Sequence, residues 1–98
     1  MTISKKLEGT ALTVMLEGRL DTTTSPELEA YLLENLEGVT ELTFDFEKLD
    51  YISSAGLRIL LSTHKKMSAL GGLKIVHVSE DISEIFEVTG FADILNIE

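Results

Sequence analysis

The fold is decided by residues 42–57, which read LTFDFEKLDYISSAGL. The stretch begins with strict alternation of apolar and polar side chains. This period of two indicates a β-strand, and we expect the strand to run out near Leu49. Ser53-Ser54-Ala55-Gly56 then begins a helix, because serine is a preferred residue at a helix start. A strand that leads directly into a helix is typical of an α/β fold.

The helix that begins at Ser53 carries one apolar face. The residues of that face fall at the i, i+3, i+4, i+7 spacing of an amphipathic helix. They are Leu57, Leu60, Leu61 and His64. Gly71-Gly72 ends the helix. We expect His64 to be a packed, hydrogen-bonded histidine on this face rather than a ligand.

Two paired strands are predicted before this region. Residues 3–7 and 12–16 read as strands joined across a turn at Gly9, and the second strand ends at Gly18. After the helix that begins at Ser53, residues 73–78 read as a strand. The sequence therefore predicts strands both before and after the 42–57 stretch.

A further helix is predicted between the early strands and Leu42, and it can start in two ways. Ser25 can be the N-cap with Pro26 at the first helical position, or Thr24 and Glu27 can form a capping box. Both starts lead into one apolar stripe. The stripe consists of Leu28, Tyr31, Leu32 and Leu36.

The C-terminal segment predicts a last helix and a last strand. Ser79 is expected to cap a short helix, and Gly90 followed by Phe91 is expected to end it with a Schellman motif. Residues 94–97 read as a short strand. The acidic residues between Ser79 and Gly90 are interpreted as the solvated face of this helix.

The order of elements predicts the fold class and the place of a site. It indicates one α/β domain over residues 1–98, with a mostly parallel, mixed sheet of four to five strands packed against helices. In open α/β sheets the binding crevice lies outside the carboxyl ends of the strands. Loops 18–25 and 49–54 are therefore expected on one rim, with Asp21, Asp50 and several hydroxyls.

Composition narrows the classes of function. The 98 residues include 8 basic and 17 acidic side chains, so the net charge of −9 opposes binding to nucleic acid or to anionic lipid. With no cysteine, the chain has no disulfide, cysteine-ligated metal site or thiol nucleophile. Its apolar runs are far shorter than the ~20 residues of a membrane span, and no signal peptide follows Lys5 and Lys6. We expect a cytoplasmic protein without membrane insertion.

Ser53 and Ser54 are the most informative candidates for a site. The N-terminus of a helix offers free N–H groups and a dipole that favours negative charge, so a phosphate on Ser54 could be accommodated there. The alternative is that one of these serines only caps the helix, as most serines at helix starts do. Arg58, one turn further on, could contact an acidic partner.

The sequence gives little support for an enzyme or for a metal site. Asp21, Ser54 and His77 supply the three residue types of a hydrolase triad, and His77 ends a predicted strand near the same rim. The stretch lacks the Gly-x-Ser-x-Gly elbow of such hydrolases, so we expect no catalytic residues. The two histidines show no spacing of a known metal site, so neither a metal nor a cofactor is expected.

At the level of the whole chain, the sequence resembles the STAS domain of bacterial anti-sigma factor antagonists. The residues that carry the resemblance are Gly18-Arg19-Leu20-Asp21, Asp45-Phe46, Leu49, Ile52-Ser53-Ser54-Ala55-Gly56-Leu57, Gly71-Gly72-Leu73 and Val88-Thr89-Gly90-Phe91. The resemblance covers essentially the whole chain. Ser53 stands where the family commonly has Asp, and Ala55 where Ser or Thr is frequent.

The resemblance implies a partner-switching protein that is not an enzyme. The unphosphorylated family member binds an anti-sigma factor that is also a serine kinase of the GHKL type, and so frees the sigma factor. Phosphorylation, at Ser54 by position or alternatively at Ser53, releases it, and a serine phosphatase can reverse this. The partner-binding residues implied are Asp21, Thr22, Thr23, Ser53, Ser54, Gly56, Leu57 and Arg58. An alternative is an unphosphorylated STAS subunit that docks on an ATPase or transporter component.

Overall fold

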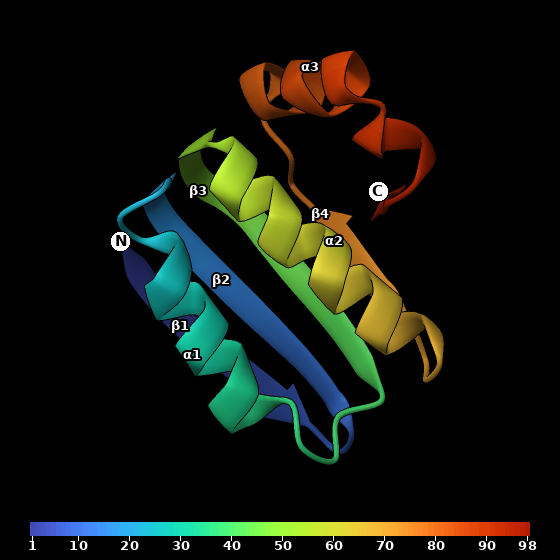
Figure 1. Ribbon diagram of the computed structural model, residues 1–98. Coiled ribbons are helices and arrows are strands. Elements are labelled where there is room, and N and C mark those ends of the chain that lie inside the picture. Colours follow the sequence, from blue (N-terminus) through green and yellow to red (C-terminus); the bar gives the residue numbers. More distant parts are fainter.

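The sheet is organised around its two longest strands (Figure 1). In the computed structural model, which describes residues 1–98, β2 (Ala11–Leu20) and β3 (Glu41–Ile52) pair in parallel. β1 (Thr2–Glu8) pairs antiparallel with β2 across the predicted turn, where Gly9 has a φ of +62°. β4 (Leu73–Val76) and β5 (Asn96–Ile97) continue the parallel pairing, in the strand order β1-β2-β3-β4-β5. The predicted mixed α/β sheet is confirmed.

The helices leave one face of the sheet open. Figure 1 shows α1 (Ser25–Asn35) and α2 (Ser54–Ser68) side by side over one face, with α3 (Glu80–Thr89) beyond the short β4 and in contact with β3. Side chains of β2 and β3 that point to the helices are fully buried, whereas Thr43 and Asp45 on the other face are only half-buried. This asymmetry results from parallel crossovers that all lie on one side of the sheet.

One core joins the helices to the sheet. Phe44 and Phe46 lie at its centre, with ring centroids 5.7 Å apart. The predicted apolar stripe of α1 is confirmed. On α2 the predicted face is confirmed at Leu57 and Leu60 and corrected beyond them, because Thr63 and Met67 are buried there while Leu61 and His64 are only half-buried. The 21 buried members of the cluster include residues of all three helices and of three of the five strands, so the chain forms a single domain.

β3 is longer than predicted, and the reason is irregular pairing. Between Met15 and Glu17, and again between Gly18 and Arg19, β2 advances by one residue fewer than β3. The buried residues of β3 are therefore spaced three apart, at Phe46, Leu49 and Ile52. A period of two does not describe this segment, so the strand continues to Ile52 rather than ending near Leu49. Its neighbour β2 likewise runs past Gly18 to Leu20.

Several other predicted boundaries are corrected. β4 ends at Val76 because His77 adopts a left-handed backbone with a φ of +57°, which L-residues rarely adopt. α2 ends at Ser68, before the predicted glycines. Gly71 lies after the helix, where only a residue without a side chain fits, because a Cβ there would lie 2.4 Å from the Thr40 carbonyl oxygen. The C-terminal strand is only two residues long because a short 3-10 helix, η1 (Phe91–Asp93), takes up the chain before it.

The start of α1 matches part of each prediction, because Pro26 lies in its first turn and Thr24 takes the N-cap position of the predicted capping box. The N-cap is Thr24, but its side chain makes no capping hydrogen bond. Instead the Thr24 hydroxyl donates to the Arg19 carbonyl at 2.7 Å, and the Ser25 hydroxyl donates to the Asp21 carbonyl. The loop before the helix uses both hydroxyls for its own bonds. By contrast Ser79 caps α3 as predicted, and Gly90 ends that helix in the left-handed conformation.

Candidate functional site

The structure brings the two predicted loops together at the carboxyl ends of β2 and β3. The backbone amide of Ser53 donates to the carbonyl of Leu20 at 2.8 Å, which ties the exit of β3 to the exit of β2. Ser53 is the N-cap of α2, and Ser54 is its first residue. We call the surface formed by Asp21–Thr24 and Ser53–Arg58 the rim. Asp50, which was predicted in the loop, instead lies exposed within β3.

The two serines of the rim have different environments. Ser53 is half-buried, and its hydroxyl accepts a long hydrogen bond of 3.5 Å from the Gly56 amide. Ser54 is exposed, and its hydroxyl makes no hydrogen bond within the protein. Capping therefore accounts for Ser53. It does not account for Ser54, whose hydroxyl is accessible to another protein.

Asp21 is used by its own loop. Its carboxylate accepts hydrogen bonds from the amides of Thr23 and Thr24, at 3.0 and 3.1 Å, and lies 3.7 Å from Nε of Arg19. The bond from the Thr24 amide is the main cause that lowers the pKa of Asp21 below its ordinary value of 3.8. Asp21 bonds neither serine of the rim. These bonds give Asp21 a role in shaping its own loop, and its contact with a partner stays a prediction.

Arg19 and Tyr51 also belong to this region, and sequence reasoning missed them. They are opposite each other in the β2–β3 register, and the guanidinium carbon of Arg19 lies 4.4 Å from the centroid of the Tyr51 ring. This geometry is a cation–π contact. The pair would follow from the sequence if both strands were extended to Leu20 and Ile52. The buried residues of β3 change from a spacing of two to a spacing of three, and this change hid the extension.

Gly56 and Leu57 support the rim from inside. Leu57 is only 6% exposed and belongs to the core. A Cβ on Gly56 would lie 2.8 Å from Cγ of Leu20 and 2.9 Å from Cγ1 of Ile52. The absence of a side chain at Gly56 thus lets α2 begin close against the ends of β2 and β3. Both residues are buried and position the start of α2, and their contact with a partner stays a prediction.

A hollow of about 240 Å³ lies between the two halves of the rim. It is a shallow, open hollow bordered by the loop before α1, the start of α1 and the first turns of α2. Its lining residues are Thr22, Ser25, Pro26, Glu29, Ala55, Arg58 and Ile59. Thr22, Thr23, Ser54 and Arg58 are all exposed. These four predicted contact residues are therefore accessible from solvent, and Thr22 and Arg58 face the same hollow.

His77 lies away from the rim, so the hydrolase triad is not assembled. Its Nδ1 is 3.0 Å from Oδ1 of Asp45, and this hydrogen bond raises the pKa of His77 above its ordinary value of 6.5. β4 pairs with β3 only as far as Asp45, and β3 continues for 52 − 45 = 7 residues to Ile52. At ~3.3 Å per residue, the end of β3 at Ile52 is roughly 23 Å along the strand from Asp45, the partner of His77. The expectation that His77 lies near Ser54 is wrong.

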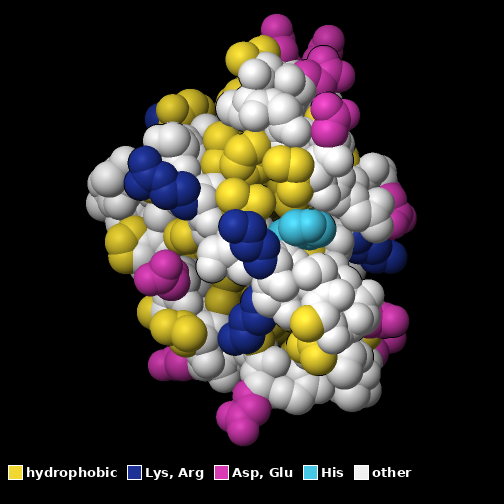
Figure 2. All heavy atoms as spheres, turned by 45° about the vertical axis from the view of Figure 1, so that its right-hand side comes forward, with side chains coloured by type: hydrophobic (Ala, Val, Ile, Leu, Met, Phe, Trp, Pro, Cys, Tyr) yellow, Lys and Arg dark blue, Asp and Glu magenta, His cyan; other side chains and the backbone are white.

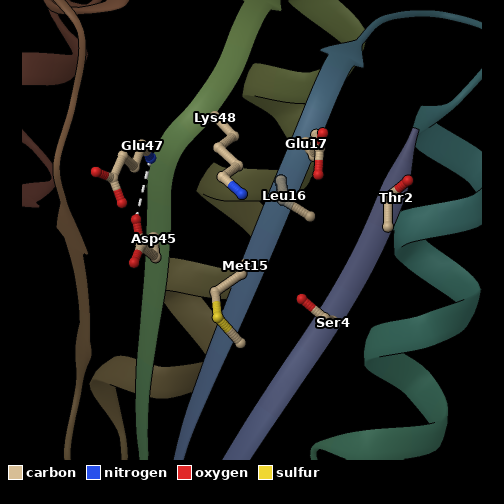
Figure 3. A pocket seen from close by; sticks show the side chains of 8 residues that line it. All are labelled: Thr2, Ser4, Met15, Leu16, Glu17, Asp45, Glu47 and Lys48. Carbon is tan, nitrogen blue, oxygen red and sulfur yellow. Dashed lines mark hydrogen bonds between the residues drawn. The ribbon is translucent and has the colours of Figure 1, made fainter.

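A second hollow lies on the open face of the sheet, away from the helices (Figure 3). Its volume is about 230 Å³, and Figure 3 shows side chains of β1, β2 and β3 around it. These are Thr2, Ser4, Met15, Leu16, Glu17, Asp45, Glu47 and Lys48. Asp45 and Glu47 also come within 4.8 Å of His77, which makes this the one group of potential metal ligands. Its donors are largely exposed, and Asp45 and His77 bond each other.

The remaining features concern α2 and α3. Nδ1 of His64 is buried without a hydrogen-bond partner, so the prediction of a hydrogen-bonded histidine is wrong for this atom.

Figure 2 shows Lys and Arg side chains across the middle of one face and acidic side chains at the top, where α3 lies. The acidic residues of α3 are Glu80, Asp81, Glu84 and Glu87. None of the helices has the length and apolar character needed to span a bilayer.

Comparison with known proteins agrees with this architecture. The anti-sigma-B factor antagonist of Bacillus subtilis is 31% identical over 85 residues, which cover 86% of this chain and 78% of that protein. The anti-sigma-B factor antagonist of Staphylococcus aureus is 33% identical over 86 residues, which cover 86% of this chain and 80% of that protein.

Solved structures show the same fold. An anti-sigma factor antagonist from Mycobacterium paratuberculosis superposes with a TM-score of 0.87 at 22% identity, covering 98% of this chain and 83% of that one. SpoIIAA in its unphosphorylated form gives a TM-score of 0.76 at 17% identity, covering 99% and 87%. Residues 2–98 match the STAS domain family. The chain belongs to the STAS domain family.

Proposed function

We propose that this protein is an anti-sigma factor antagonist that works by partner switching. In its unphosphorylated form it binds, through the rim, an anti-sigma factor that is also a serine kinase of the GHKL type. Phosphorylation of Ser54 releases that partner, and a serine phosphatase restores binding. The observation that carries the proposal is the exposed, unbonded hydroxyl of Ser54 at the first position of α2. The names of the relatives support the antagonist class.

Ser54 is a better phosphoryl acceptor than Ser53. Transfer forms a bond between Oγ of Ser54 and the γ-phosphorus of ATP, breaks the bond to the leaving ADP, and releases the hydroxyl proton. Such a step needs a side chain that can enter a kinase active site. The Ser54 hydroxyl is free to do so, whereas the Ser53 hydroxyl caps α2 and is half-buried.

The charge of the phosphate accounts for release. A phosphoserine carries about −1.5 to −2 charges at pH 7. A carboxylate on the partner ~4 Å away is repelled by ~1 kcal/mol per unit charge in water, and by about 4 kcal/mol in a partly desolvated interface. The net charge of −9 increases the opposition to further negative charge.

The test uses the anti-sigma factor kinases encoded by the source genome. Each purified kinase is incubated with ATP and the wild-type protein, Ser54→Ala or Ser62→Ala, and the modified residue is located by mass spectrometry. Ser62 is the matched control because it is an exposed serine of the same helix. We expect one kinase to modify the wild type and Ser62→Ala, but not Ser54→Ala.

Binding is then measured by calorimetry with phosphoserine installed genetically at position 54. We expect the unmodified protein to bind the kinase and the modified one to lose at least tenfold in affinity. Modification elsewhere in the chain, or equal affinity of both forms, would contradict the proposal.

A further inference from the structure

The two arginines of the chain, Arg19 on β2 and Arg58 on α2, differ in their contacts. Arg19 is held by the Tyr51 ring and by Asp21. Arg58 is exposed on α2 and takes part in none of the three ion pairs of the molecule. One guanidinium is therefore committed to the fold, and the other is available.

Arg58 lies one helical turn after Ser54. Residues at i and i+4 are neighbours on a helix surface, with Cβ atoms about 5–6 Å apart. Long side chains on a helix lean back towards its N-terminus, so the guanidinium of Arg58 can reach the position of the Ser54 hydroxyl. A negative residue that precedes a positive one by four is also the favourable orientation for a helical ion pair.

The other charged groups nearby do not replace this pairing. Glu29 lines the same hollow as Arg58 but makes no ion pair with it. The other cations of α2 are Lys65 and Lys66 in its last turn, roughly 16 Å or more along the helix axis from Ser54. Arg58 is thus the cation of α2 within reach of a group attached to Ser54.

We propose that a phosphate on Ser54 is captured by Arg58 on the next turn of α2, which withdraws this arginine from the partner-binding surface. This inference rests on the proposed function, because it concerns the phosphorylated state. Phosphorylation then has two local effects. It adds negative charge to the rim, and it also removes the free cation that an acidic side chain of the unphosphorylated protein's partner would use.

The first measurement, which tests capture, needs no kinase. Phosphoserine is installed genetically at position 54, and the second pKa of the phosphate is measured by ³¹P NMR titration in the full chain. A neighbouring cation favours the dianion, so Arg58→Gln is expected to raise this pKa by about 0.3 or more. Arg58→Lys should restore part of the shift. Lys66→Gln, at the far end of the same helix, is the matched control and should leave the pKa unchanged.

The result that overturns capture is a phosphate pKa that is the same in the wild type and in Arg58→Gln. A second measurement tests withdrawal: in the unphosphorylated state, Arg58→Gln should bind the kinase about two- to fivefold more weakly than the wild type. Equal affinity would overturn that part. The proposed function fails by a different result, equal binding of the modified and unmodified wild type, so the two failures are distinguishable.

Discussion

Two regions at carboxyl ends of parallel strands have different properties in this protein. At the rim, β2 and β3 end together at Leu20 and Ile52, and a helix begins directly after β3. At the His77 corner, formed by His77, Asp45 and Glu47, the short β4 ends beside the middle of β3. The rim presents an unbonded hydroxyl and a free guanidinium. The corner presents charges that satisfy one another on the open face.

The difference teaches that strand length decides which strand ends form a common site. The rule that ligands bind at the carboxyl ends of parallel strands assumes ends at one level. Here β4 has 4 residues and β3 has 12, so their ends do not meet. Measurements that disturb each region separately can test this comparison.

The largest effect is expected from filling the space under the rim. Gly56→Ala places a methyl group against the side chains of Leu20 and Ile52, and overpacking of this kind typically costs about 1–3 kcal/mol. The free energy of unfolding is measured by urea titration. Ser62→Ala, on the exposed face of the same helix, should change it by less than about 0.5 kcal/mol. Equal stability of Gly56→Ala and the wild type would show that α2 does not depend on close approach here.

A smaller effect is expected at the outer edge of the rim. Tyr51→Leu keeps an apolar side chain but removes the aromatic face on which Arg19 lies, which is worth about 0.5–1 kcal/mol at an exposed site. A double-mutant cycle with Arg19→Gln isolates the pair, because it subtracts the effect of each single change. Strictly additive unfolding free energies would mean that the contact contributes nothing to stability.

The smallest effect is expected at the His77 corner, and it depends on pH. Because the pKa of His77 is raised by Asp45, the protonated histidine stabilises the folded state. This contribution is fully present below 6.5, the ordinary pKa of histidine, and is lost as the pH rises through the raised value. NMR titration of the His77 ring should show the raised pKa in the wild type and a lower one in Asp45→Asn.

The control for the corner is Asp50→Asn, which makes the same change at an exposed carboxylate of β3 without an ion pair. The His77 titration should be unchanged in this variant. If Asp45→Asn also left the pKa of His77 unchanged, the charges of Asp45 and His77 would not be coupled. The contrast between paired groups at the corner and free groups at the rim would then not hold.

Much of the fold was predictable because most elements follow a regular period. The first half of β3, the apolar stripe of α1 and the capped start of α3 all obey local rules, and each was confirmed. The second half of β3 was not predictable from a period of two, since two register shifts place its buried residues three apart. The Arg19–Tyr51 contact and the true level of the strand ends were missed for the same reason.

For the site, the chemistry of single residues was predictable and their accessibility was not. The serine pair at a helix start follows from capping preferences, and the STAS family follows from residues spread over the whole chain. Which serine caps the helix depends on the backbone angle at the β3–α2 junction. The engagement of Asp21 by its own loop, and the burial of Leu57, likewise depend on how the loop and helix pack.

The sequence by itself determined the α/β class, the order of elements and the serine pair before α2, because hydrophobic period and capping act over a few neighbouring residues. The tertiary structure alone decided that Ser54 is free while Ser53 is used, that Arg58 is unpaired while Arg19 is not, and that His77 is distant from both. These outcomes arise from strand register and helix packing, which bring together residues far apart in the chain and are not encoded in any single local segment.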